Sequence, residues 1–233
     1  MSRKALFSKR RRRAAALGAA GLGACAVLAA CSPVQAGSAA IVGNQRITVS
    51  SLDTQVSNWT TAAKPYGSSL QVTTADAPAA VLSWLVRFAV MDQVAASNGI
   101  SVTDAQAQAG LSALSAVASQ NGASSTAQLL IANGISPQMF PLVGRYEAQE
   151  DAFARKGNGG QEPTSTAAQN AFNTAFTKAQ CTAAKSLNIQ ISPQYGRLDY
   201  TQFAVVPAAD TLSKPVPTGT PTPVSTTGLT PAC

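Results

Sequence analysis

Cysteine is the residue type in this sequence with the widest chemistry open to it. The 233-residue chain contains four cysteines and no histidine. Without histidine, Ser-His-Asp catalysis, Cys-His catalysis and histidine-ligated metal sites are excluded. The sequence also lacks a CxxC pair, a GxSxG elbow and a glycine-rich phosphate loop. It therefore predicts neither an enzyme nor a metal site, and leaves the cysteines for covalent attachment or disulfide formation.

Cys31 follows a segment with the features of an export signal. Residues 1–13 are strongly basic, residues 14–30 are apolar and rich in alanine, and small residues precede the cysteine. The stretch Leu28-Ala29-Ala30-Cys31 resembles a bacterial lipoprotein lipobox. This resemblance implies that residues 1–30 are a signal peptide and that the Cys31 thiol carries a diacylglycerol with acyl chains such as palmitate. It also implies an anchor on the extracytoplasmic face of the cell membrane. The alternative is an uncleaved transmembrane helix, but the apolar run is shorter than the ~20 residues that a span prefers.

The formal net charge of +7 belongs to the N-terminal segment alone. Seven of the 17 Lys and Arg lie in residues 1–30, which contain no acidic residue. The remaining chain therefore has ten basic and ten acidic residues, and its formal net charge is zero. Phosphate contacts need a basic surface. The sequence therefore predicts no nucleic-acid partner, and the basic head is expected to meet the cytoplasmic leaflet during export by either the Sec or the Tat route.

Hydrophobic periodicity predicts one helical domain over residues 39–206, after a tether at 31–38. Residues 39–47 predict a hairpin that turns at Gly43-Asn44. Alternation over residues 187–191 predicts a strand. The segment 157–163 is a glycine-rich linker, and residues 207–233, rich in Pro and Thr, are predicted to be disordered. Capping and stop residues predict six helices, at roughly 48–66, 76–98, 103–121, 126–132, 136–156 and 164–186.

The helix over residues 76–98 is the predicted core helix. Its apolar residues fill one broad arc, which leaves Ser83 and Arg87 on the other side, while Asp92 lies in the middle of the apolar arc. A charged carboxylate in an apolar setting is costly unless it is paired. We therefore expect either a solvated Asp92 at an exposed helix end or a buried ion pair with Arg145.

Cys181 and Cys233 are the cysteines that remain after the signal peptide and Cys31 are set aside. Cys181 falls opposite Phe172 and Phe176 on its predicted helix and therefore faces outward. A structural free thiol is more often buried, and a disulfide persists in an oxidising compartment. A Cys181–Cys233 disulfide would tie the tail to the sixth helix and contribute ~2–4 kcal/mol. Two free thiols are the alternative.

The order of these elements and several short motifs resemble a family of extracytoplasmic foldases. The motifs are Asn98-Gly99-Ile100-Ser101-Val102-Thr103-Asp104, Asn133-Gly134-Ile135-Ser136 and Ile189-Gln190-Ile191-Ser192-Pro193-Gln194-Tyr195-Gly196. Together with the hairpin, they are similar to the N-terminal chaperone domain of SurA and PrsA-type proteins. The resemblance implies a mainly α, trigger-factor-like fold closed by a small antiparallel sheet. In that sheet Ile189 and Ile191 would join Ile41 and Ile47.

The resemblance also implies a function. Foldases of this family carry a parvulin prolyl isomerase domain where this chain has only the linker 157–163, so we expect no isomerase activity and no cofactor beyond the lipid. The expected role is a chaperone-like binding module for unfolded or exported polypeptides. A structural or ligand-binding lipoprotein of the cell envelope, with the same fold but no client binding, is the alternative. Five aromatic residues could line a client groove or could be ordinary core residues: Trp59, Trp84, Tyr66, Phe140 and Tyr195.

Overall fold

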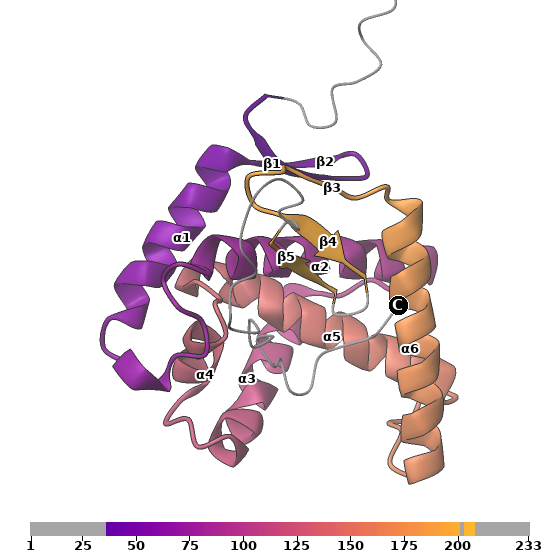
Figure 1. Cartoon of the computed structure of the whole chain (residues 1–233). Helices are drawn as coiled ribbons and strands as arrows, with labels where there is room; N and C mark the ends of the chain where they lie inside the picture. The colour runs from indigo at the N-terminus through magenta and orange to yellow at the C-terminus, as the bar shows by residue number, and fades with distance from the viewer. Residues whose placement is uncertain (1–35, 201–202, 208–233) are drawn as a thin grey trace, which may run out of the picture. The chain divides into compact units, whose positions relative to one another are not determined.

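A computed structural model describes residues 36–200 and 203–207 of the chain (Figure 1). The predicted signal peptide, Cys31 and the Pro/Thr-rich tail after residue 207 lie outside these residues. The lipidation, the export signal and the disorder of the tail therefore stay predictions.

The described residues form a mainly helical domain with two small antiparallel sheets, which confirms the predicted fold class. The α-helices are α1 (Val49–Ala63), α2 (Ala77–Ser97), α3 (Asp104–Gln120), α4 (Thr126–Ala132), α5 (Phe140–Gly157) and α6 (Thr166–Ser186). Two 3-10 turns, η1 (Gly67–Ser69) and η2 (Pro137–Met139), precede α2 and α5. The strands are β1 (Ser38–Val42), β2 (Gln45–Thr48), β3 (Gln190–Ile191), β4 (Arg197–Asp199) and β5 (Ala204–Val206).

Hydroxyl side chains begin most of these helices. Each of four N-cap residues accepts a hydrogen bond from a backbone N–H three residues later: Thr48, Thr103, Ser125 and Ser165. Thr103 also forms a capping box with Gln106. Ser136, which precedes η2, makes no cap bond, and its hydroxyl donates to Gln55 on α1 instead.

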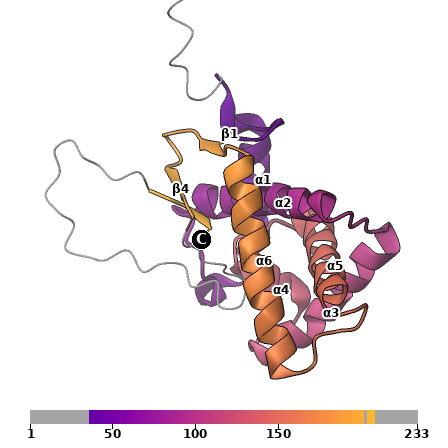
Figure 2. The same cartoon turned by 90° about the vertical axis from the view of Figure 1, so that its right-hand side faces the viewer.

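The returning strand closes the domain on its N-terminal hairpin, as the family resemblance implied. β1 lies between β2 and β3 and is antiparallel to both, with Ile191 opposite Ala40. Figure 2 shows α6 running up to β1, where the Gly43 N–H donates to the Leu187 carbonyl over 2.7 Å. Gly43 has a φ of +58°, and a Cβ there would lie 2.7 Å from Leu187 Cδ2, so this position favours glycine. The strand is shorter than predicted, and Ile189 precedes it.

α2 is the core helix, and it is buried on more sides than its sequence predicted. Ser83 and Arg87 are 7% and 6% exposed, although they were expected on a polar side. The reason is the β4–β5 hairpin, which was not predicted and which lies in front of α2 in Figure 1. The Val205 N–H donates to Ser83 Oγ over 2.8 Å, and Arg87 Nε donates to the Phe203 carbonyl over 3.0 Å.

α2 alone among the described helices is long and apolar enough, by length and composition, to cross a membrane. Its apolar side chains are buried by the rest of the domain, which is the usual position of the core helix of a folded domain. Val81, Leu82, Val86 and Met91 have no exposed surface.

Candidate functional site

A line of aromatic and polar side chains crosses the domain from α2 through α5 to α6. The ring centres of Trp84 and Phe88 are 5.9 Å apart, and Phe88 meets Tyr146 edge-on at 6.2 Å. The Gln180 amide donates from Nε2 to the Tyr146 hydroxyl over 3.0 Å. Tyr146 and Gln180 are both 4% exposed. Side chains of three helices therefore meet around Tyr146.

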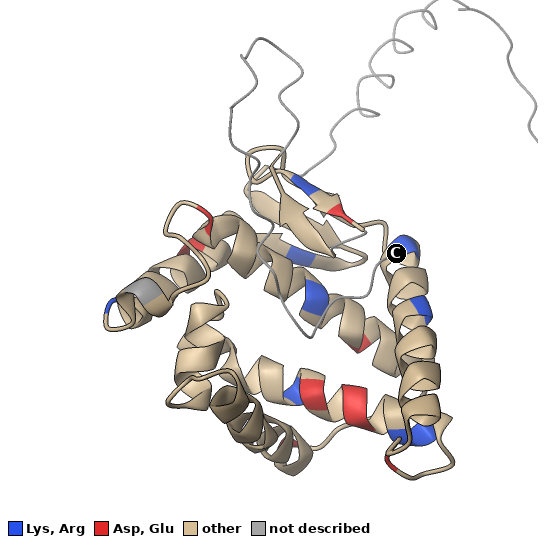
Figure 3. Ribbon diagram, turned by 60° about the horizontal axis from the view of Figure 1, so that its bottom comes forward, with Lys and Arg blue, Asp and Glu red and all other residues tan. Residues whose placement is uncertain are grey.

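Two carboxyl groups of α5 belong to the same region, and acidic residues colour α5 red in Figure 3. Burial, and after it the charge of Glu147, raises the pKa of Glu150 to about 8. Burial also raises the pKa of Glu147, to about 7. The pKa of Tyr146 is raised by burial first and then by the charge of Glu150. These carboxyl groups therefore keep part of their protons at neutral pH.

Two acceptor atoms in this region have no hydrogen-bond partner. Glu150 Oε2 and Gln180 Oε1 are both buried, and neither accepts a hydrogen bond. A buried acceptor without a donor costs free energy, because water no longer satisfies it. Within the described residues, these are two of the four buried side-chain atoms that have no hydrogen-bond partner.

Three phenylalanines pack against one another between α5 and α6. The ring of Phe153 lies 5.5 Å from that of Phe176 and 6.4 Å from that of Phe172, and the latter two rings stack at 5.3 Å. Glu150 follows Tyr146 by four residues and precedes Phe153 by three, so the three share one face of α5. We call Tyr146, Glu147, Glu150, Gln180 and these three phenylalanines the α5–α6 site.

Arg87 is the buried cation on the α2 side of this region. Its guanidinium carbon lies 4.9 Å from the centre of the Trp84 ring. Burial lowers its pKa, and the nearby Tyr146 opposes that shift. Because Arg87 Nε donates to the Phe203 carbonyl, Arg87 links the aromatic line to the β4–β5 hairpin.

The Asp92–Arg145 ion pair is present, but it is not buried. Arg145 Nη2 lies 2.9 Å from Asp92 Oδ1, and Gln149 Nε2 donates to the same oxygen over 2.9 Å. The side chains of Arg145 and Asp92 are 51% and 33% exposed. The predicted pairing therefore forms, whereas the predicted burial does not. An ion pair this exposed contributes little to stability.

The predicted client groove of five aromatic residues is not formed, because Trp59 and Trp84 are core residues. They are 1% and 5% exposed, and their indole N–H groups donate to the carbonyls of Ile131 and Asn133 over 2.7 and 2.9 Å. These hydrogen bonds to the end of α4 hold both indoles inside the domain. The other three are half-buried and pack against the core: Tyr66, Phe140 and Tyr195.

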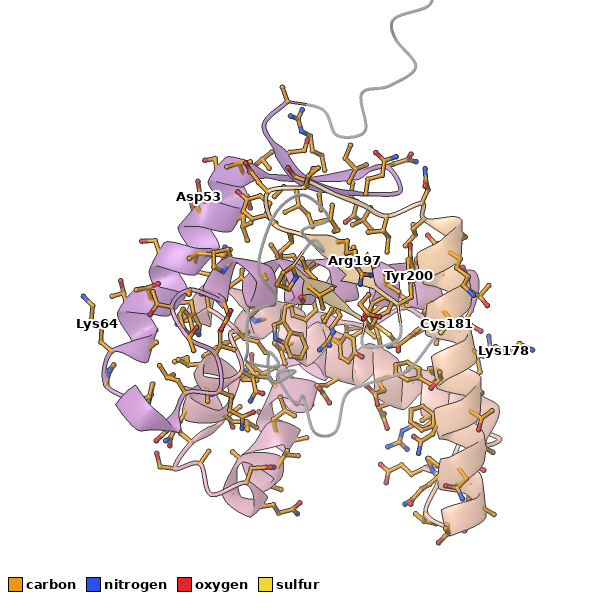
Figure 4. All side chains as sticks on the ribbon, in the orientation of Figure 1. Asp53, Lys64, Lys178, Cys181, Arg197 and Tyr200 are labelled. Atoms are coloured by element: carbon orange, nitrogen blue, oxygen red, sulfur yellow. The ribbon has the colours of Figure 1, made fainter. Side chains whose placement is uncertain are left out.

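Cys181 on α6 is disulfide-bonded. It is half-buried, and Figure 4 labels it on the helix, with Arg197 and Tyr200 on the neighbouring β4 segment. Cys233, its predicted partner, lies outside the described residues. The Cys181–Cys233 pairing therefore stays a prediction.

The described part of the chain offers little else for chemistry. Over residues 36–200 and 203–207, no group of three His, Cys, Asp or Glu could hold a metal ion. A shallow hollow of about 700 Å³ lies along the first turns of α1. Its lining includes Asp53, which is labelled in Figure 4, and otherwise consists mainly of hydroxyl and amide side chains on the helix surface.

A family model for the SurA-like N-terminal domain matches residues 15–147. The chain belongs to this family. No curated protein and no solved structure matches it significantly. The SurA N-terminal domain is the non-catalytic chaperone part of a chaperone-like foldase family. The match confirms the predicted resemblance. It covers the N-terminal hairpin and the helices up to the middle of α5 in this SurA-like domain.

Sequence reasoning missed the α5–α6 site of this SurA-like domain, although a signal for it exists. Glu150 stands between Tyr146 and Phe153 on one face of α5. Gln180 stands four residues after Phe176 on the apolar face of α6. A polar residue at an apolar position of a helical pattern could have singled out both.

Proposed function

We propose that this SurA-like protein is a lipid-anchored, chaperone-like binding module for exported polypeptides, held outside the cell by an acyl chain on Cys31. The observation that carries the proposal is the family match over residues 15–147. A closed helical body supports it, because α2 and the β2-β1-β3 sheet form a scaffold that does not depend on a client.

We also propose that the protein holds its clients without isomerising their prolyl bonds. α5 ends at Gly157 and α6 begins at Thr166. The foldases that this chain resembles carry their isomerase domain at the position of this connection. A domain of about 100 residues does not fit in so short a connection.

A second candidate function is a structural or ligand-binding lipoprotein that does not bind clients. The observation that favours it is the surface: among the described residues, the large hydrophobic side chains that are exposed are Val117 and Leu142, at 41% and 39%. A holding chaperone usually offers a broad apolar patch. Under the first proposal, client binding therefore depends on mixed polar and aromatic contacts, and its affinity is expected to be weak.

An aggregation assay distinguishes the two functions. A denatured exported protein is diluted into buffer with the full-length protein purified in detergent, and light scattering is followed. We expect suppression at a several-fold molar excess, relative to an unrelated lipoprotein in the same detergent. No suppression at that excess favours the structural lipoprotein. A peptide isomerisation assay is expected to show the uncatalysed rate.

A further inference from the structure

The α5–α6 site presents hydrogen-bond acceptors and lacks donors to satisfy them. We propose that it binds the cationic side chain of a Lys or Arg in a client polypeptide, with Glu150 as the pairing carboxylate and Gln180 Oε1 as the neutral acceptor. This inference rests on the proposed function and adds a substrate preference to it.

The unpartnered atoms indicate a ligand that donates hydrogen bonds. Gln180 is 4% exposed and donates through Nε2 to the Tyr146 hydroxyl, which leaves its Oε1 without a donor. Glu150 Oε2 is buried and also unpartnered. An ammonium group carries three N–H donors and a guanidinium group five, and neither accepts a hydrogen bond. A Lys or Arg side chain therefore supplies what both atoms lack.

The charges around Glu150 also favour a cation. On α5 its ionisable neighbours are Tyr146 and Glu147, and the charge of Glu147 disfavours a second negative charge. On α2 the cation is Arg87, which interacts with Tyr146, and from α6 the site receives Gln180, which does not ionise. A bound cation would stabilise the Glu150 carboxylate. Binding should therefore tighten as the pH rises through the pKa of Glu150, about 8.

The walls of the site suit a long side chain with a charged end. The rings of Phe153, Phe172 and Phe176 contact one another between α5 and α6, and Phe153 shares a face of α5 with Glu150. They would offer apolar surface to the methylene groups of Lys or Arg. Glu150 is half-buried as a residue, although its Oε2 atom is buried. A metal ion suits the site less well, because no third ligand of the required type joins the carboxylates in the described residues.

The test uses two fluorescent peptides that differ in one side-chain functional group. One unstructured, mainly apolar peptide contains a single Arg, and the other contains citrulline, the neutral analogue of Arg. Binding to the full-length protein in detergent is measured by anisotropy above pH 8. We expect the Arg peptide to bind about tenfold more tightly, the gain typical of one charge-assisted hydrogen bond. Glu150→Gln should abolish that difference, whereas Asp151→Asn, at an exposed carboxylate of the same helix, should preserve it.

The other outcomes separate failure of the cation site from failure of the proposed function. If the wild-type protein binds both peptides equally, the cation site is wrong and client binding stands. If it binds neither, the proposed function fails, and the site is then tested with Nα-acetylarginine amide alone. A rise in the melting temperature of the wild type, absent in Glu150→Gln, supports the site, and no rise overturns it. Should Glu150→Gln not fold, the wild type alone decides, because its preference for the Arg peptide must disappear below pH 6.

Discussion

The raised pKa of Glu150 makes the stability of the whole fold depend on pH. Its folded pKa is about 8 against an ordinary value of 4.5. Between these two values the folded protein binds more protons than the unfolded chain, so its stability falls as the pH rises. This contribution is fully present below pH 4.5 and is lost as the pH passes about 8. We therefore expect a higher melting temperature near pH 5 than near pH 8, measured by thermal denaturation in matched buffers.

A substitution at Glu150 tests the assignment. Glu150→Gln resembles the protonated carboxyl group, so the variant should be more stable than the wild type near pH 8 and less sensitive to pH. Asp151→Asn should keep the pH dependence of the wild type. Glu147, with a pKa raised to about 7, accounts for the slope that remains in Glu150→Gln. A variant with an unchanged slope would contradict the burial of Glu150.

Gly144 allows α5 to cross α3 at close range. A Cβ at Gly144 would lie 2.3 Å from the Ala107 carbonyl oxygen, and a Cβ at Gly110 would lie 2.6 Å from the Gly144 carbonyl oxygen. Because backbone atoms cannot move aside as a flexible side chain does, Gly144→Ala should lower the free energy of unfolding by about 1–3 kcal/mol. Urea denaturation measures this change.

Gly157→Ala, at the end of the same helix, is the matched control. Nothing lies within 4 Å of a Cβ at that position, so the substitution should leave stability nearly unchanged or raise it by a few tenths of a kcal/mol. Similar losses in both variants would contradict the crossing as the cause of the effect at Gly144, because Ala favours a helix more than Gly does.

At the scale of elements, the β4–β5 hairpin depends on α2 for its position. The Val205 N–H donates to Ser83 Oγ in the core. Ser83→Ala leaves that N–H without an acceptor, which should cost about 1–3 kcal/mol. Hydrogen exchange should accelerate in β5 more than in β1 or β2. Ser112→Ala is the control, because the Ser112 hydroxyl bonds only to its own exposed helix among the contacts described.

The helices were predictable from local signals, and the second hairpin was not. Thr48 and Thr103 mark helix starts in the sequence and cap helices in the structure. The sixth helix, predicted from residue 164, begins at Thr166. β4 and β5 have three residues each, too few for an alternating pattern to stand out. Their stability comes from contacts with Ser83 and Arg87, which are more than a hundred residues away in the chain.

At the scale of the whole molecule, the predicted Cys181–Cys233 disulfide would attach the C-terminal tail to α6, and this can be tested. If its partner is Cys233, non-reducing peptide mapping will recover the two cysteines in one linked pair. Cys181→Ser should then expose one free thiol and lower the free energy of unfolding by ~2–4 kcal/mol. A linked peptide with Cys25 or Cys31 in place of Cys233 would make the predicted pairing wrong.

If Cys31 carries a lipid anchor, the protein should be found in the membrane fraction. Cys31→Ser removes the thiol that the diacylglycerol would modify, so the variant should leave the membrane fraction, and the acyl mass should be missing from its N-terminal peptide. Wild-type protein with an intact, unmodified N-terminus would contradict the anchor. Cys25→Ser, within the same apolar segment, is the control and should stay in the membrane fraction.

The sequence by itself determined the helical class and the capped helix starts, because these depend on residues close together. The return of the chain to its first hairpin was implied by the family resemblance. It also indicated that Asp92 could pair with Arg145. Only the tertiary structure decided that Trp59 and Trp84 are core residues, that Arg87 is covered, and that Gln180 reaches Tyr146 beside Glu150. The physical reason is that periodicity shows which residues share a face, whereas burial and charge depend on which faces meet.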